Sequence, residues 1–300
     1  MIKLICYKVP FKMLVIFLFL VVIILLTLGV YWFNLPKPIP NSIQKKLFEG
    51  ITYVRDVRKT PRPIIIHVVS IDLTDPKIRF LVTPGKAVKE GDIGAQTTSQ
   101  FLTEFNLQIA VNGSFFYPFR EKFWNAYPRY AGDPVYVVGF ASSRGQVYSQ
   151  PAQDFETFYI SADNQAQFQK PIGAIYNAIS GAQLFLKQGQ VQTPFIGNTN
   201  NEKPYPRTCL ALDQAAKTLM IIVIDGKQKN YSEGVTLAEL ADIVLSYGAD
   251  SALNMDGGGS STLVRADSAG QAILLNSPIH ARIPGYERLI ANHLGVYRAP

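Results

Sequence analysis

The sequence contains few residues of the types that make covalent or metal cross-links. Among its 300 residues are two cysteines, Cys6 and Cys209, and three histidines. A long apolar segment separates the cysteines, so we expect no disulfide, and an extracytoplasmic domain without one is more typical of a bacterial envelope than of a eukaryotic secreted scaffold. The histidines (His67, His280 and His293) are scattered and form no zinc-binding pattern. The sequence therefore predicts neither a bound metal nor a cofactor.

The main part of the chain also lacks an excess of positive charge. The net charge of +7 comes from the first 12 residues and from residues 34–63, which leaves residues 64–300 close to neutral. A domain that binds nucleic acid is normally strongly basic. We therefore expect no nucleic-acid partner.

The N-terminal segment predicts a membrane helix. Residues 1–12 are basic, and the uncharged run from Met13 to Phe33 is about as long as a bilayer-spanning helix requires. This run is longer than the apolar part of a cleaved signal peptide, and it ends in Tyr31-Trp32-Phe33, an aromatic group typical of membrane interfaces. We expect residues 13–33 to be an uncleaved signal anchor, with residues 1–12 in the cytoplasm and the folded domain outside the membrane.

The rest of the chain divides into a linker and one domain. Residues 34–63 are basic and contain five prolines, which predicts a semi-extended linker, interrupted by a short amphipathic piece near Ile43 to Phe48. This linker suits contact with anionic lipid headgroups or cell-wall polymers, or serves as a solvated spacer. Residues 64–300 contain many short apolar segments between turns, a helix expected from a cap at Thr98, and a capping box at Thr236-Leu-Ala-Glu239. The expected fold is α+β, with a mixed, mostly antiparallel β-sheet core and a few helices.

A glycine-rich stretch, residues 254–262, is the strongest candidate for a functional site. The apolar residues before and after Asn254-Met255-Asp256-Gly257-Gly258-Gly259-Ser260-Ser261-Thr262 predict a strand, a glycine turn and a second strand. A backbone of successive glycines can direct several N–H groups at one anion. A tight hairpin would also use glycines, but a third glycine weakens the flanking strands without structural benefit. Because no Lys-Ser or Lys-Thr follows, this is not the phosphate loop of a nucleotide-binding protein.

Other polar residues follow predicted strands. Asn112 and Asp225 each precede a glycine, and Arg207 lies between a proline and an apolar strand, where its guanidinium suits an anion. Each of these has an ordinary structural alternative, since Asn-Gly and Asp-Gly are common turns and a surface arginine can pair with a carboxylate. The aromatic stretch from Tyr117 to Asp133 is long for a loop and suits the faces of sugar rings, or folds down as a lid.

Together these motifs resemble the phosphodiester glycosidase family over roughly residues 64–298. The motifs are Asn112-Gly-Ser-Phe-Phe, Arg207-Thr-Cys-Leu-Ala-Leu-Asp213, Asp225-Gly226, the capped helix, the stretch from Leu253 to Leu263, and Glu287-Arg288 followed by Ala291-Asn292. The chain departs from the family pattern at Cys209-Leu-Ala and at Asn276-Ser-Pro-Ile-His. The resemblance implies hydrolysis of a sugar-1-phosphodiester at the anomeric carbon.

The resemblance also implies roles for individual residues. Asp256 is the expected catalytic carboxylate, with Asp225 or Glu287 as its rival or partner. The expected phosphate ligands are Arg207, Arg288 and the backbone amides of Gly257, Gly258, Gly259 and Ser260. The expected sugar ligands are Asn112, Asn254 and Asn292, and Ser261 is a further expected substrate-binding residue. The expected partner is a carbohydrate phosphodiester or an envelope glycan. A rival interpretation is a non-catalytic protein of exopolysaccharide or envelope assembly that binds glycan in the same cleft.

Overall fold

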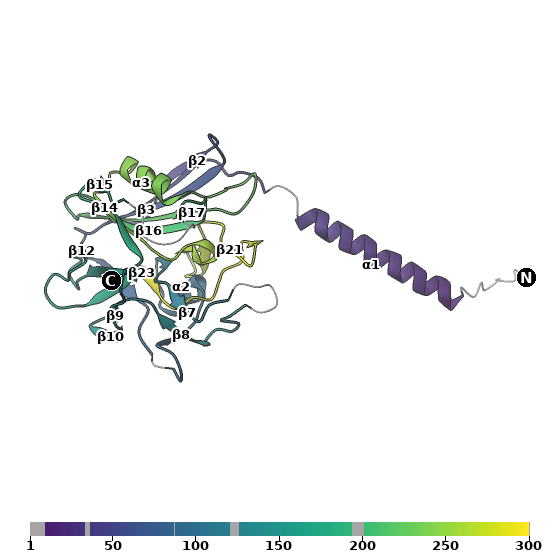
Figure 1. The fold of residues 1–300 in the computed structure, drawn as a ribbon, viewed down its shortest axis with the longest axis horizontal. Helices are drawn as coiled ribbons and strands as arrows, with labels where there is room; N and C mark the ends of the chain where they lie inside the picture. The colour runs from purple at the N-terminus through teal and green to yellow at the C-terminus, as the bar shows by residue number, and fades with distance from the viewer. Residues whose placement is uncertain (1–9, 34–36, 87, 121–125, 194–200, 300) are drawn as a thin grey trace, which may run out of the picture. The chain divides into compact units, whose positions relative to one another are not determined.

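The chain forms two compact units, residues 1–39 and 40–300. A computed structural model describes residues 10–33, 37–86, 88–120, 126–193 and 201–299 (Figure 1). In the first unit, helix α1 (Phe11–Phe33) is long and apolar enough to cross a membrane, although a signal sequence would have the same character. It includes the predicted span, residues 13–33, and begins within the predicted cytoplasmic tail, of which residues 1–9 lie outside the described residues.

The second unit is built around an eight-stranded sheet. Its strands are, in spatial order, β1 (Ile43–Phe48), β2 (Ile51–Arg58), β3 (Ile64–Asp72), β17 (Thr218–Ile224), β16 (Arg207–Leu212), β18 (Ser251–Asn254), β14 (Gln183–Lys187) and β15 (Gln190–Val191). Alternate residues of β17 face opposite sides of this sheet. Met220 and Ile222 pack against helix α3 (Leu237–Ser246), whereas Leu219 and Ile221 pack on the opposite side, against strands of other sheets. Both faces of the sheet are therefore buried, which explains the continuous apolar runs in these strands.

A five-stranded sheet covers the face opposite α3. Its order is β20 (Ala272–Leu274), β19 (Leu263–Ala266), β6 (Ile109–Asn112), β23 (His293–Arg298) and β4 (Ile78–Val82). Phe101 and Leu102 of helix α2 (Thr98–Glu104) cover the far side of this sheet. The domain core thus has four layers, namely α3, the large sheet, the second sheet and α2 (Figure 1).

Three smaller sheets complete the described part of the domain. They comprise β10 (Gln146–Ser149), β9 (Ala141–Ser143), β13 (Asn177–Gly181), β11 (Glu156–Ile160) and β12 (Ala166–Phe168) in one sheet, β5 (Ile93–Gly94), β8 (Pro134–Val137) and β7 (Phe116–Tyr117) in the next, and β21 (Ile279–His280) with β22 (Ile283–Pro284) in the last. The paired strands described here are antiparallel. The α+β fold with a mostly antiparallel core is therefore confirmed.

Both predicted helices are present. Thr236 Oγ1 accepts a hydrogen bond from Glu239 N, and Glu239 Oε2 accepts one from Thr236 N, so the capping box begins α3 as expected. The cap of α2 is Thr97 rather than Thr98, because it is the Thr97 side chain that accepts a hydrogen bond from Gln100 N.

The structure corrects the extent of the predicted linker, residues 34–63. Strands β1 and β2 lie within this range, and β2 pairs with β3 along its whole length. Ile51 and Tyr53 of β2 are almost completely buried in the core between the two large sheets. Because these residues complete the hydrophobic core, the compact domain begins at Pro40 and not at Ile64.

Candidate functional site

The glycine turn connects the two large sheets. It leaves β18 of the first sheet, passes through a short 3₁₀ turn (Gly258–Ser260) and enters β19 of the second sheet. The expected strand, turn and strand are present, but the turn is a crossover between sheets and not a hairpin. Gly258 has a φ of 63°, in the left-handed region that favours glycine. A Cβ on Gly257 would lie only 2.9 Å from Pro206 O, so this close approach of the two backbone segments requires glycine.

Asn112 holds this turn from behind. Its Nδ2 donates to Asp256 O at 2.6 Å, and its Oδ1 accepts hydrogen bonds from Thr208 Oγ1 at 2.8 Å and Thr262 N at 3.1 Å. Asn112 is fully buried and does not line the cavity described below. The structure therefore places it as a support of the turn, not at the position of a ligand to a sugar hydroxyl.

A cavity of about 390 Å³ lies in front of the turn. Seven of the predicted site residues line it: Arg207, Asn254, Asp256, Gly257, Gly258, Gly259 and Arg288. These residues come from β16, from the end of β18, from the turn itself and from the segment before β23, so the fold brings together motifs that are far apart in the sequence. Nine further lining residues were not among the predicted ones, and five of these have aromatic, amide or charged side chains that bear on the argument below: Phe115, Phe119, Gln183, Tyr205 and Lys227.

Two buried arginines supply positive charge to the cavity. Arg207 Nε donates to Val235 O at 3.1 Å, and burial lowers the pKa of this side chain to about 10, so it remains protonated at neutral pH. Arg288 donates to Ser260 Oγ at 3.0 Å and to His280 Nδ1 at 3.3 Å, and its guanidinium lies 4.2 Å from the centre of the Phe119 ring. Neutral groups thus fix the orientation of both side chains in these contacts.

Asp256 is the acidic residue that lines the cavity within the described part of the chain. The side chain is half-buried, and its Oδ1 accepts a hydrogen bond from Gly257 N at 2.9 Å. Asn254 lies beside it and is buried, and its Oδ1 has no hydrogen-bond partner among the described residues. An unsatisfied buried acceptor costs about 1–3 kcal/mol, so this oxygen lowers the stability of the fold.

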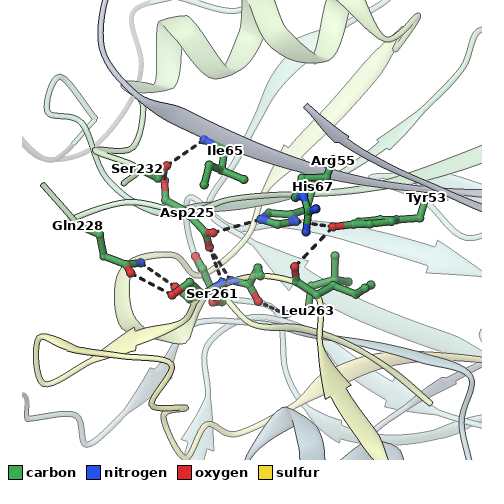
Figure 2. A network of polar contacts seen from close by, with 12 residues as sticks. Tyr53, Arg55, Ile65, His67, Asp225, Gln228, Ser232, Ser261 and Leu263 are labelled. Atoms are coloured by element: carbon green, nitrogen blue, oxygen red, sulfur yellow. Dashed lines mark hydrogen bonds and ion pairs between the residues drawn. The ribbon is translucent and has the colours of Figure 1, made fainter. Parts of the chain in front are cut away.

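Asp225, the first proposed rival of Asp256, lies in a different environment. It follows β17 and points between the two large sheets, where its Oδ2 is 3.1 Å from His67 Nε2 (Figure 2). Its Oδ1 accepts hydrogen bonds from Asn276 Nδ2 at 3.1 Å and Ser277 N at 2.8 Å. Tyr53 Oη lies 2.8 Å from His67 Nδ1 and extends the network. Asp225 is 1% exposed and does not line the cavity.

The other predicted residues also have supporting positions. Glu287 accepts hydrogen bonds from Ser99 N and Ser99 Oγ at the start of α2, and burial raises the pKa of its carboxyl group. Asn292 Oδ1 accepts a hydrogen bond from Ser114 N at 2.7 Å. Ser260 accepts from Arg288, as described above, and Ser261 Oγ lies 3.1 Å from Thr208 Oγ1, to which its hydroxyl can donate. None of these four lines the cavity as far as the structure describes it.

Of the residues that the sequence analysis missed, Tyr205 and Lys227 are the nearest to recognised motifs. Tyr205 lies two residues before Arg207, and Lys227 follows Asp225-Gly226. The Lys227 ammonium is 4.0 Å from the centre of the Tyr205 ring. Proximity to these motifs was a usable signal for both residues. Gln183 had no comparable signal, because it enters the cavity from a strand without a motif.

Comparison with known proteins gives the family. The profile of the phosphodiester glycosidase family matches residues 105–297. The chain belongs to this family. A comparison with curated proteins gave no match. The family match includes the glycine turn, both arginines and Asn112, and it leaves β1 to β5 and α2 outside.

Solved structures show the same fold at low sequence identity. A hypothetical protein from Synechocystis has a TM-score of 0.56 and 16% identity, with 86% of this chain and 64% of that chain covered. The zebrafish N-acetylglucosamine-1-phosphodiester alpha-N-acetylglucosaminidase catalytic domain, auto-inhibited by its pro-peptide, has a TM-score of 0.59 and 19% identity, covering 87% and 84%. A protein from Burkholderia pseudomallei has a TM-score of 0.53 and 16% identity, covering 78% and 74%. This chain therefore spans just under two thirds of the Synechocystis protein.

Proposed function

We propose that this protein hydrolyses a sugar-1-phosphodiester at the bond between the anomeric carbon and the phosphate oxygen. The observation that carries the proposal is the meeting of one half-buried carboxylate, Asp256, with two buried guanidinium groups, Arg207 and Arg288, in one cavity. Membership of the phosphodiester glycosidase family supports it.

The charges suit this reaction. Cleavage of this bond releases a phosphate monoester, which is a weak base, so the departing oxygen needs little help from a general acid. The site must instead bind the phosphate charge and stabilise an oxocarbenium-like anomeric carbon. Arg207 and Arg288 supply the first function, and Asp256 supplies the second. Asp256 either accepts a proton from the attacking water, which inverts the anomeric configuration, or bonds to the anomeric carbon first, which retains it.

The sugar has a place in the same cavity. The amide side chain of Asn254 suits a hydroxyl group of the sugar, and the half-buried Phe115 ring suits its apolar face. We further propose that α1 is an uncleaved anchor, with the catalytic domain outside the membrane and acting on an envelope or extracellular glycan. A positively charged N-terminus and a long apolar helix are the observations behind this placement.

The test is release of free sugar by the full-length protein in detergent micelles from a panel of sugar-1-phosphodiesters. Asp256→Asn removes the charge without changing the size of the side chain, and we expect turnover to fall by at least about 100-fold. Asp242→Asn, on the exposed face of α3, makes the same chemical change away from the cavity and is the control. Unchanged turnover in Asp256→Asn would refute the assignment of the carboxylate.

The rival function, glycan binding without catalysis, makes a different prediction. A binding protein would show no turnover on any member of the panel, yet would retain glycans of the same composition in an equilibrium binding assay. A compact cavity lined by one carboxylate and two arginines favours catalysis, since a binding protein for polymers is expected to present a long open aromatic groove.

A further inference from the structure

Lys227 is an exposed cation at the cavity with no role in the proposed reaction. It follows Asp225-Gly226 in a left-handed backbone conformation, with φ of 56°. Its ammonium lies 4.0 Å from the centre of the Tyr205 ring and 4.0 Å from the position that a Cβ on Gly258 would occupy. The lysine head is therefore held beside the glycine turn.

The surroundings of Lys227 do not neutralise its charge. In the described part of the chain its ammonium makes no ion pair, and its contact with Tyr205 is a cation–π interaction. An exposed cation–π contact contributes about 0.5–1 kcal/mol, and a non-glycine residue in the left-handed region costs about 1–2 kcal/mol. The contacts of Lys227 therefore stabilise the fold little. Binding of an anionic ligand would account for a lysine at this position.

Lys227 and Arg207 lie on the same aromatic ring. The Arg207 guanidinium carbon is 5.9 Å from the centre of the Tyr205 ring, and the Lys227 ammonium is 4.0 Å from it, so the two cations are neighbours. Arg207 is buried, whereas Lys227 is exposed. A chain of anionic groups entering the cavity would meet Lys227 at its mouth and Arg207 at its interior.

The burial of the other lining residues orients the substrate. Asn254, whose side chain lines the cavity, is buried at the interior with Arg207. If the sugar occupies that end, the alcohol on the other side of the phosphodiester, the aglycone, extends toward the exposed mouth. The aglycone is then the part of the substrate that passes Lys227.

We propose that Lys227 and Tyr205 form a second anion subsite, which binds a phosphate or carboxylate group on the aglycone of the sugar-1-phosphodiester. The substrate would then carry at least two negative charges, as a diester of a phosphorylated or acidic alcohol does. This inference rests on the proposed function and specifies its substrate class.

The experiment uses full-length protein in detergent micelles and the sugar that the first panel identifies. Three sugar-1-phosphodiesters are compared, with glycerol, glycerol phosphate or glycerate as the alcohol. A fourth, with a uronic acid as the sugar and glycerol as the alcohol, places the second charge at the other end. The measured quantity is kcat/KM for each charged substrate divided by kcat/KM for the neutral-aglycone substrate.

We expect the wild-type ratio for the charged aglycones to exceed one by about fivefold to tenfold at low salt and to fall as salt is added, because exposed charges are screened. Lys227→Gln should bring this ratio close to one, and Lys227→Arg should largely restore it. Lys229→Gln, an exposed lysine of the same loop that does not line the cavity, should leave the ratio at the wild-type value.

Three results would overturn the inference. The wild-type ratio could equal one, Lys227→Gln could lower turnover of neutral and charged substrates equally, or the uronic acid substrate could be the one that gains. In each of these cases turnover is present, so the proposed function stands while the subsite falls. Absence of turnover on all four substrates would instead refute the proposed function, and the subsite with it.

Discussion

Replacement of Asp225 is expected to destabilise the fold, in contrast to replacement of Asp256, which is expected to stop turnover. The Asp225 carboxylate is almost fully buried and accepts hydrogen bonds from His67, Asn276 and Ser277. In Asp225→Ala these three donors lose their acceptor in a region that water does not reach. Each buried donor left unsatisfied costs about 1–3 kcal/mol, and the removal of one partner from a buried charged network costs about 3–5 kcal/mol in all.

Asp225→Asn provides a milder perturbation of the same network. The amide oxygen can still accept from Asn276 and Ser277, and the amide nitrogen can donate to His67 if the imidazole carries its proton on Nδ1. Tyr53 Oη would then accept from His67 Nδ1, to which it is adjacent at 2.8 Å. Because each position keeps a partner, we expect a loss of only about 1 kcal/mol.

The assay is thermal unfolding together with turnover. For a domain of this size 1 kcal/mol shifts Tm by about 2–4 °C, so Asp225→Ala should lower Tm by about 6–20 °C and Asp225→Asn by a few degrees. Asp256→Asn should leave Tm within about 2 °C of wild type and abolish turnover. If Asp225→Asn keeps the wild-type Tm but loses turnover as completely as Asp256→Asn, then Asp225 is a catalytic residue and the assignment above is wrong.

Three further predictions concern the turn, the core and the domain boundary. Gly258→Ala should lower kcat/KM, because a φ of 63° costs alanine about 1–2 kcal/mol although there is space for its Cβ. Gly258→Asn should retain more activity, since asparagine tolerates this conformation. Equal activities of the two variants would argue against a conformational cause. Burial lowers the pKa of His293 to about 3, so below its ordinary value near 6.5 the unfolded state binds a proton that the folded state does not. The free energy of unfolding, measured by urea titration, should therefore fall as pH is lowered from about 6.5 toward 3, by at most about 1.4 kcal/mol per pH unit, and His293→Gln should reduce this slope; an unchanged slope would assign it to other groups. A fragment that begins at Pro40 should be monomeric in size-exclusion chromatography, whereas one that begins at Ile64 exposes the edge of β3 and should aggregate; equal behaviour would show that β1 and β2 are dispensable.

The different positions of Asp225 and Asp256 explain why the sequence did not separate the two carboxylates. Both follow apolar strands and both precede glycines. The side of the sheet on which Asp225 lies depends on the parity of β17, in which alternate residues face opposite layers. Since both faces of this strand are buried, its sequence is apolar throughout and contains no alternation from which parity can be inferred. The position of Asp225 therefore follows only from the packing of the two sheets.

The boundary of the domain was missed for a related reason. Strand β1 lies at the sheet edge with its polar residues exposed, and β2 buries residues such as Ile51 and Tyr53 on one face only. The prolines and positive charge of residues 34–63 are equally compatible with a linker. Only the pairing of β2 with β3, which is a contact made after folding, assigns this segment to the domain.

The motifs that identified the family act mainly on the backbone of the site. Asn112 and Thr208 hold the turn through hydrogen bonds, and Gly257 allows it to approach Pro206. Few other residue types can make these hydrogen bonds or allow this close backbone approach, so such positions form recognisable sequence motifs. Residues that contact the aglycone, such as Lys227 under the inference above, obey no such restriction, because many side chains fit an exposed position. Substrate preference in this family is therefore expected to vary at Lys227 and its neighbours while the turn is retained, and exchange of Lys227 should change which phosphodiester is cleaved without changing the reaction.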